Sequence, residues 1–308
     1  MSGNLERVRT EQLDPISGIP QASASAFMGT AKPATGRMLY VDSQDYLDHS
    51  AFNPRFPSMQ AAFEELQRGD TINLYGKIDE SGLIGPDRNI TDVTIQGMGT
   101  RTRPGHGGES AKAGGADWSN AKDNFTDPLL TIIAQGWSIQ GIHFGGRIRL
   151  SQTVDWMQSA SHAEFRNNAF SGGSIGIEDS GGCANVGIYG CQFYGFGKPG
   201  QTAIMSTSTA WAWPLMWEIV GNRFMNNDRH VVIPLSNSIV KGNTLFRVGY
   251  EGKINATAIS LAGGKNNVVT HNNFVCLATD AVGAYIAGEG DAWGPNYCAD
   301  KVLYGISL

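Results

Sequence analysis

A short pattern of apolar and small polar residues recurs along most of the chain. Its clearest copy is Trp217-Glu-Ile-Val-Gly-Asn-Arg-Phe-Met225, where a Gly-Asn pair separates two segments in which apolar residues alternate with others. Apolar residues two positions apart are typical of a β-strand and not of a helix. The other copies are residues 139–144, 165–170, 188–193, 240–245 and 269–274, with a degenerate first copy at 95–100.

The copies recur at intervals that indicate a repeat architecture. The fourth position of the pattern lies at residues 98, 142, 168, 191, 222, 243 and 272, so successive copies are 44, 26, 23, 31, 21 and 29 residues apart. Periods of this size are typical of solenoids, in which each unit buries its apolar side only against its neighbours. We therefore predict an all-β coil of about eight to ten turns, each lying roughly 4.8 Å from the last.

Three columns of side chains should run along such a coil. The first apolar position predicts one interior stack of Ile139, Phe165, Ile188, Ile219, Val240 and Val269. The last predicts a second stack of Phe144, Phe170, Phe193, Phe224, Leu245 and Phe274. Asn168, Asn222, Asn243 and Asn272 fall where the coil bends, and stacked Asn side chains can hydrogen-bond from amide to amide. We interpret these asparagines as structural residues and not as catalysts.

The sequence before the repeats suggests an arm and a cap. Residues 1–36 are rich in Ser, Ala, Gly, Pro and Thr, which predicts an extended N-terminal arm that does not fold alone. Residues 37–70 predict a strand, Met38–Asp42, and a helix over residues 58–68 that buries Met59, Phe63 and Leu66. This helix would cover the open edge of the first turn.

Residues 71–308 make up the predicted coil, with a Gly-rich inserted loop at 101–128. A further strand in each turn is expected at residues 175–177, 203–205, 231–233, 258–261 and 282–286, and a closing strand at 302–308.

Three stretches in a fixed order carry a family resemblance. They are Leu39-Tyr-Val-Asp42, Phe56-Pro-Ser-Met-Gln-Ala-Ala62 and Gly69-Asp-Thr-Ile-Asn-Leu-Tyr-Gly76. Together they resemble the opening of pectin-lyase-like right-handed parallel β-helices, and within that superfamily they are most similar to tailed-bacteriophage proteins. Residues 135–144 and 159–165 strengthen the likeness, which covers about residues 37–308.

The resemblance implies a right-handed parallel β-helix that serves as a virion structural protein, made in the host bacterial cytoplasm. Surface spikes, head fibres and decoration proteins are the roles it suggests. Residues 1–36 would attach to other virion proteins, the chain would form a homo-oligomer, with a trimer favoured, and it would adhere to host surface glycans. Because the fold also carries lyases and hydrolases, the main alternative is a tailspike depolymerase that cuts host polysaccharide, and a third possibility is an internal scaffold or neck protein.

The composition argues against several other classes of protein. Forty glycines among 308 residues, roughly 13% against a usual ~7%, suit a coil with many tight corners. A net charge of −5 argues against a nucleic-acid-binding protein. We see no apolar run that would cross a membrane and no secretory signal in residues 1–10. The cysteines lack metal-type spacing, so we predict no metal and no cofactor, with Cys191 and Cys276 buried as small apolar residues.

Catalytic residues are not assigned by the sequence. Glycan hydrolysis needs two facing carboxylates, and elimination needs a base beside the sugar. The candidates are Glu178, Asp179, Asp228 and His230, but counting from the bend column places no acids in register on neighbouring turns. We therefore expect Glu178 and Asp179 to be solvated acids, and His230 to be a surface or internally bonded residue in a turn.

Two tryptophans are candidates for contact with a glycan or another subunit. Trp211 and Trp213 fall in a loop before a repeat, whereas Trp137 and Trp217 each stand five residues before the bend column and should pack locally. Tryptophan is enriched where proteins meet. For Trp211 and Trp213 we rank local packing first, subunit contact second and glycan contact third.

Overall fold

The computed structural model describes residues 36–43, 54–98, 116–119, 127–151, 159–208, 214–246, 257–275 and 285–298. The chain divides into two units, Met1–Gly36 and Arg37–Leu308. Apart from Gly36, the predicted N-terminal arm lies outside the described residues, and the elements below all belong to the second unit.

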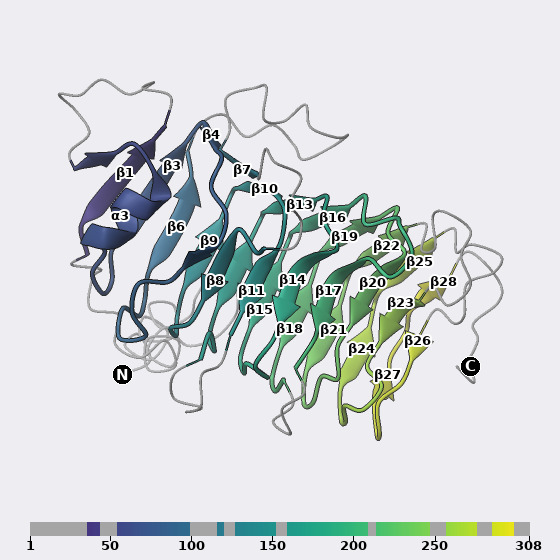
Figure 1. Cartoon of the computed structure of the whole chain (residues 1–308). Helices are drawn as coiled ribbons and strands as arrows, with labels where there is room; N and C mark the ends of the chain where they lie inside the picture. Colours follow the sequence, from purple (N-terminus) through teal and green to yellow (C-terminus); the bar gives the residue numbers. More distant parts are fainter. Residues whose placement is uncertain are drawn as a thin grey trace, which may run out of the picture. The chain divides into compact units, whose positions relative to one another are not determined.

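Three all-parallel sheets make up the fold, and each takes every third strand of the chain (Figure 1). The first sheet contains, in spatial order, β2 (Arg55–Phe56), β1 (Met38–Asp42), β3 (Thr71–Tyr75), β6 (Thr94–Gly97), β9 (Ser138–Gln140), β12 (Glu164–Arg166), β15 (Gly187–Tyr189), β18 (Glu218–Val220), β21 (Ile239–Lys241), β24 (Val268–Thr270) and β27 (Ala292–Trp293). The second contains β4 (Lys77–Ile78), β7 (Asp117–Ser119), β10 (His143–Gly145), β13 (Ala169–Ser171), β16 (Gln192–Tyr194), β19 (Arg223–Met225), β22 (Thr244–Phe246), β25 (Asn273–Val275) and β28 (Tyr297–Cys298). The third contains β5 (Leu83–Ile84), β8 (Leu130–Ile132), β11 (Ile148–Leu150), β14 (Ile175–Asp179), β17 (Thr202–Ser206), β20 (Arg229–Val232), β23 (Thr257–Ser260) and β26 (Tyr285–Ile286).

The chain is therefore a parallel β-helix, as the repeats predicted. One turn consists of a strand from each sheet, such as β12, β13 and β14. The third sheet has eight strands, so the described coil completes eight turns, and β27 and β28 begin a ninth. Each of the six clear copies of the sequence pattern supplies a strand of the first sheet and one of the second, joined at the bend, whereas the degenerate copy at 95–100 supplies only β6. The predicted further strand of each turn is the third-sheet strand.

Both predicted apolar stacks are confirmed. In the first sheet Phe165 is the register partner of Ile139 on one side and of Ile188 on the other, and the file continues through Ile219, Val240 and Val269. In the second sheet the rings of Phe144, Phe170, Phe193 and Phe224 stack with centroids 5.1, 4.8 and 5.0 Å apart. All of these side chains are buried.

The asparagine column forms the predicted ladder. Asn222 Nδ2 donates to Asn243 Oδ1 (3.1 Å), and Asn243 Nδ2 donates to Asn272 Oδ1 (2.9 Å). Asn272 in turn donates to Asn296 (3.0 Å), a member that the sequence pattern did not identify. Cys191 takes the place of an amide between Asn168 and Asn222, and its thiol is buried as expected. Cys276 lies outside the described residues.

The predicted helix is present and shorter. Helix α3 runs over Met59–Glu65, with Ser58 as its N-cap and Leu66 as its C-cap. Met59, Ala62 and Phe63 join the core, and the Phe63 ring lies edge-on to Trp137 with centroids 5.9 Å apart. The helix contacts β1 and β2, and Glu80 of the first turn accepts the backbone N–H groups of Met59 and Gln60. It thus covers apolar side chains at the start of the coil.

Strand β7 lies inside the range expected as an inserted loop, residues 101–128, and gives its turn a second-sheet strand. The predicted closing strand at 302–308 lies outside the described residues.

Candidate functional site

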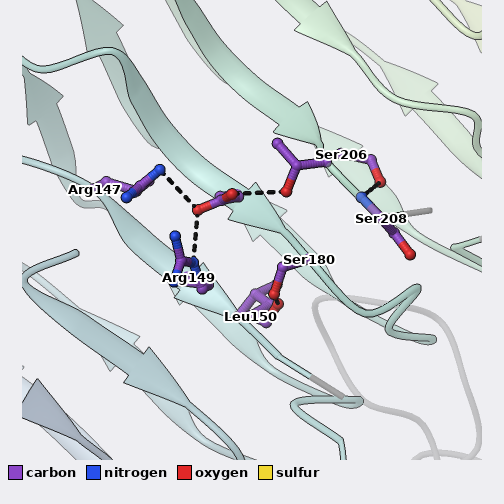
Figure 2. Close-up of polar contacts among 8 residues, drawn as sticks. Arg147, Arg149, Leu150, Ser180, Ser206 and Ser208 are labelled. Atoms are coloured by element: carbon purple, nitrogen blue, oxygen red, sulfur yellow. Dashed lines mark hydrogen bonds and ion pairs between the residues drawn. The ribbon is translucent and has the colours of Figure 1, made fainter. Parts of the chain in front are cut away.

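Glu178 is buried in the third sheet and holds two arginines. Its side chain is 5% exposed, and its Oε2 accepts from Arg149 Nε (2.8 Å) and lies 3.1 Å from Arg147 Nη1. Figure 2 shows the two arginines converging from β11 and the residue before it. Thr207 Oγ1 donates to the other carboxylate oxygen (2.7 Å). The expectation of a solvated acid is therefore wrong, because the neighbouring strand supplies cations that pair with the buried charge.

Burial changes the pKa of Arg147, whose side chain is more enclosed than that of Arg149. Desolvation lowers the pKa of Arg147 from its ordinary value, and Glu178 opposes that shift. The cluster is an internal ion network with every Glu178 oxygen already bonded, so it braces β11 against β14.

Asp179 is likewise buried, and the expectation of a solvated side chain is wrong here too. Its Oδ1 accepts from the backbone N–H groups of Gly182 and Cys183 (both 3.0 Å), and its Oδ2 accepts from Ser206 Oγ (3.1 Å). Desolvation raises the pKa of Asp179 above its ordinary value, while these hydrogen bonds lower it. The carboxylate closes the turn that follows β14, and Ser206 is its register partner on β17.

Asp228 and His230 are both buried. Asp228 is 3% exposed and accepts the Gly200 backbone N–H (2.8 Å). His230 lies on β20 and not in a turn; it is fully buried, with its ring 5.5 Å from that of Phe224. Asn227 Nδ2 lies 3.0 Å from its Nδ1, which agrees with the expected internal bonding, and burial lowers the pKa of His230 to about 3. A neutral, enclosed imidazole has no access to a substrate.

The four tryptophans named from the sequence fall into two pairs. Trp211 and Trp213 lie outside the described residues. Trp137 and Trp217 are fully buried, and their indole N–H groups donate to the carbonyls of Ile90 (2.9 Å) and Cys183 (2.6 Å). The expected local packing is confirmed for this second pair.

A cleft of about 390 Å³ opens at the bend between the first and second sheets. It is lined by Gly190, Gln192, Gly221 and Arg223. Both glycines have positive φ, 61° and 67°, which turns the chain sharply between the sheets. Gln192 and Arg223 are register partners on β16 and β19, so an amide and a guanidinium lie side by side at this cleft.

Beside the cleft, the outer face of the first sheet carries an aromatic ring among charges. Tyr189 Oη donates to Glu218 (2.8 Å), and the Arg166 guanidinium lies over the Tyr189 ring, 4.4 Å from its centroid. Arg166 also pairs with Glu164. Gly187 makes room for the ring, since a Cβ there would lie 2.3 Å from Tyr189 Cε2. Burial and the bond to Glu218 raise the pKa of Tyr189, so its hydroxyl stays neutral.

The outer face of the second sheet carries a chain of three polar side chains. His143 Nδ1 lies 3.0 Å from Asp117 Oδ1, and its Nε2 lies 2.7 Å from Ser171 Oγ. The three residues come from the neighbouring strands β7, β10 and β13. The sequence did not single them out, because Asp117 belongs to a strand inside the presumed insertion. Only the strand register shows that it lies opposite His143.

Within the described ranges, no group of three or more His, Cys, Asp and Glu side chains is placed to hold a metal ion. In the same part of the chain, none of the helices has the length and apolar character that a membrane crossing requires.

No protein-family model, curated protein or solved structure matches this chain.

Proposed function

We propose that the chain is a structural protein of a tailed-phage virion: a surface spike, head fibre or decoration protein that attaches through residues 1–36 and adheres to host surface glycans. The observation that carries this proposal is the internal bonding of the coil. Glu178, Asp179 and Asp228 are buried and bonded to neighbouring turns, and His230 is buried and bonded to Asn227 of its own turn. Side chains that could have served a depolymerase brace the fold instead.

The cross-bracing suits a rigid support. Successive turns are joined by strand pairing, and stacked rings from Phe144 to Phe224 and the amide ladder from Asn222 to Asn296 add to it. In such a coil each turn is stabilised by the turns on either side of it. The resemblance to phage β-helices supplies the virion context, and the bonded acids favour support and adhesion over cleavage.

The surface around Tyr189 is our candidate for glycan contact. Tyrosine offers an apolar ring face and a polar tip, while Glu218, Arg166 and the Gln192–Arg223 cleft offer hydrogen-bonding groups around it. Binding of capsule or lipopolysaccharide preparations by the purified chain should fall at least tenfold in Tyr189→Ala. The substitution Tyr297→Ala on β28, at the end of the second sheet and 64% exposed, is the matched control, and equal binding by both variants would count against this surface.

We further propose that the chain forms a homo-oligomer, with a trimer favoured, through an apolar part of the first sheet. Ile239 and Val268 are register partners on β21 and β24, and they are 37% and 42% exposed. Adjacent exposed aliphatic side chains are costly to leave in water, and a second copy of the chain would cover them.

The virion assignment can be tested directly on particles. Antibodies raised against residues 37–308 should label intact phage from a producing strain, and a chain that starts at residue 37 should no longer be incorporated. Particles that contain no such chain, or that take up the shortened chain as well as the full one, would contradict the proposal.

A further inference from the structure

We propose that Asp117, His143 and Ser171 form a serine-nucleophile site that hydrolyses carboxylic esters at the outer face of the second sheet. This inference does not depend on the virion role. It starts from the hydrogen bonds among these three side chains. The Ser171 hydroxyl lies 2.7 Å from His143 Nε2, and His143 Nδ1 lies 3.0 Å from the Asp117 carboxylate. A nucleophile bonded to a base that is oriented by a third group is the general signature of an activated serine.

The strand register builds this arrangement. Asp117 is the register partner of His143, and on the other side His143 pairs with Ala169, two residues before Ser171. The three side chains therefore run diagonally across β7, β10 and β13. The intervening Trp118, Phe144 and Phe170 are fully buried, so the residues next to them point outward by the normal alternation of a strand.

The contacts fix the proton positions. A carboxylate only accepts hydrogen bonds, so the Asp117 contact requires a proton on His143 Nδ1. In the neutral ring this leaves Nε2 as the acceptor for the Ser171 hydroxyl proton. The imidazole is thus held in the tautomer that a general base needs.

Solvent reaches the site only in part. The side chains of Asp117 and His143 are 10% and 13% exposed. Ser171, the last of the three hydrogen-bonded residues, is partly exposed. A shielded carboxylate stabilises a neighbouring imidazolium more strongly than a solvated one does, while the nucleophile remains within reach of a substrate.

The residues after the nucleophile provide backbone donors. Gly172 and Gly173 follow Ser171 directly, and both have positive φ, 73° and 84°. Backbone N–H groups next to an attacking oxygen are the usual source of stabilisation for a developing oxyanion. We assign this role to the amides of the Gly172–Gly173 turn.

The reaction balances without any further reactant than water. Ser171 Oγ attacks the ester carbonyl carbon while His143 Nε2 takes the hydroxyl proton. The carbon–oxygen bond to the alcohol then breaks, and the alcohol leaves with the proton from His143. Water attacks the acyl-Ser171 ester, gives a proton to His143, and the acid leaves as Ser171 regains its proton.

The surroundings indicate the substrate class. The site lies on a sheet face, and its outward column continues from His143 through Ala169 to Gln192 and Arg223 at the cleft. The Cα atoms of His143 and Gln192 are two strand spacings apart, roughly 10 Å. This geometry fits a short acyl ester carried on an extended hydroxyl-rich chain that lies along the face.

The test uses the full chain with two probes, a fluorophosphonate label and p-nitrophenyl acetate. Peptide mapping should place the label on Ser171, and Ser171→Ala should abolish both labelling and turnover above buffer. Asp117→Asn should lower turnover by about 10²–10⁴-fold, because the wrong imidazole tautomer is then favoured.

Ser119→Ala is the matched control. Ser119 is also a partly exposed serine of the second sheet, on β7, and should keep full labelling and turnover. Thermal melting of each variant separates loss of chemistry from loss of fold. Absence of label from Ser171 in the folded wild-type chain, or turnover unchanged in Ser171→Ala, would overturn the proposal; neither result bears on incorporation into particles.

Discussion

Asn243 shows how one side chain serves two turns at once. Its Nδ2 donates to the Ile219 carbonyl (2.9 Å) and to Asn272 Oδ1 (2.9 Å), while its Oδ1 accepts the Asn222 backbone N–H (2.9 Å). All of these groups are buried. An amide fits here because it is both donor and acceptor, which neither a carboxylate nor an aliphatic side chain can be.

Replacing that amide should be costly. Asn243→Ala leaves the Ile219 carbonyl and the Asn222 N–H buried without a partner, and we expect a loss of about 3 kcal/mol in the free energy of unfolding. Urea denaturation measures it. Thr244→Ala, at the next and partly exposed position, should cost much less; equal losses would show that the ladder adds nothing specific.

His230 should make stability depend on acidity. Its pKa is about 3 in the folded chain and 6.5 in a solvated imidazole. The unfolded state therefore binds a proton first as pH falls. Stability should be insensitive to this group above pH 6.5, and should drop by about 1.4 kcal/mol per pH unit between pH 6.5 and 3.

The variant His230→Leu isolates the contribution of His230 to the pH dependence of stability. His230→Leu removes the titrating ring, and Asn227 keeps its bond to the Phe193 carbonyl. Asp179, whose raised pKa acts in the opposite direction, is present in both proteins. The difference between their unfolding free energies should therefore change over this range; a constant difference would mean that His230 accepts a proton while folded.

The sequence could predict side chains that repeat in register, but not contacts that occur only once. Phe193 and Asn243 recur in register, so their columns could be read from spacing alone. The partners of Glu178 could not, because Arg147 and Arg149 occur in a single turn. The contacts among Asp117, His143 and Ser171 could not be predicted for the same reason, since these residues do not recur at the repeat spacing.

Elements were predictable where the period of two was regular. From β9 onward, the first-sheet strand of each turn lies directly before the bend and the second-sheet strand directly after it. The third-sheet strands were located, and the expectation that no acids lie in register with Glu178 and Asp179 is confirmed, since Glu178 faces Arg149 and Met205 and Asp179 faces Leu150 and Ser206. The count could not show that both acids are buried, because burial depends on the partners that the neighbouring turns supply.

Helix α3 packs on the coil through an aromatic contact between Phe63 and Trp137. Phe63→Ala removes the ring that packs on Trp137, and a buried Phe→Ala change costs about 3–5 kcal/mol. Because the helix packs mainly on β1 and β2, we expect the loosening to stay near the start of the coil. Hydrogen exchange should quicken in α3, β1 and β2 but not in β19 or β22.

The exposed neighbour Glu64 provides the control for this experiment. Glu64→Ala should leave exchange in all five elements unchanged. Uniformly faster exchange throughout the coil in Phe63→Ala would instead show that the helix and the turns unfold as one unit.

At the scale of the whole molecule, association should depend on the apolar part of the first sheet. The double substitution Ile239→Lys and Val268→Glu places charges on neighbouring strands that an apolar interface could not accommodate. Native mass measurement should shift from an oligomer to a single chain, with little change in melting temperature because both side chains are exposed.

A double substitution elsewhere on the surface checks that charge alone is not responsible. Lys265→Glu with Glu289→Lys exchanges two existing charges at positions that are also paired between turns. It should leave the native mass unchanged. An oligomer that survives the change at Ile239 and Val268 would place the subunit contact on another face.

The amide ladder has a consequence for how such a chain can grow. Asn222 and Asn243 stand 21 residues apart and make the same contacts, each to the turn before and the turn after. Copying residues 222–242 in tandem would therefore insert a complete coil segment whose ends match both neighbours. Genes for this architecture can lengthen their product by duplication, in steps of roughly 4.8 Å, without redesigning either terminus.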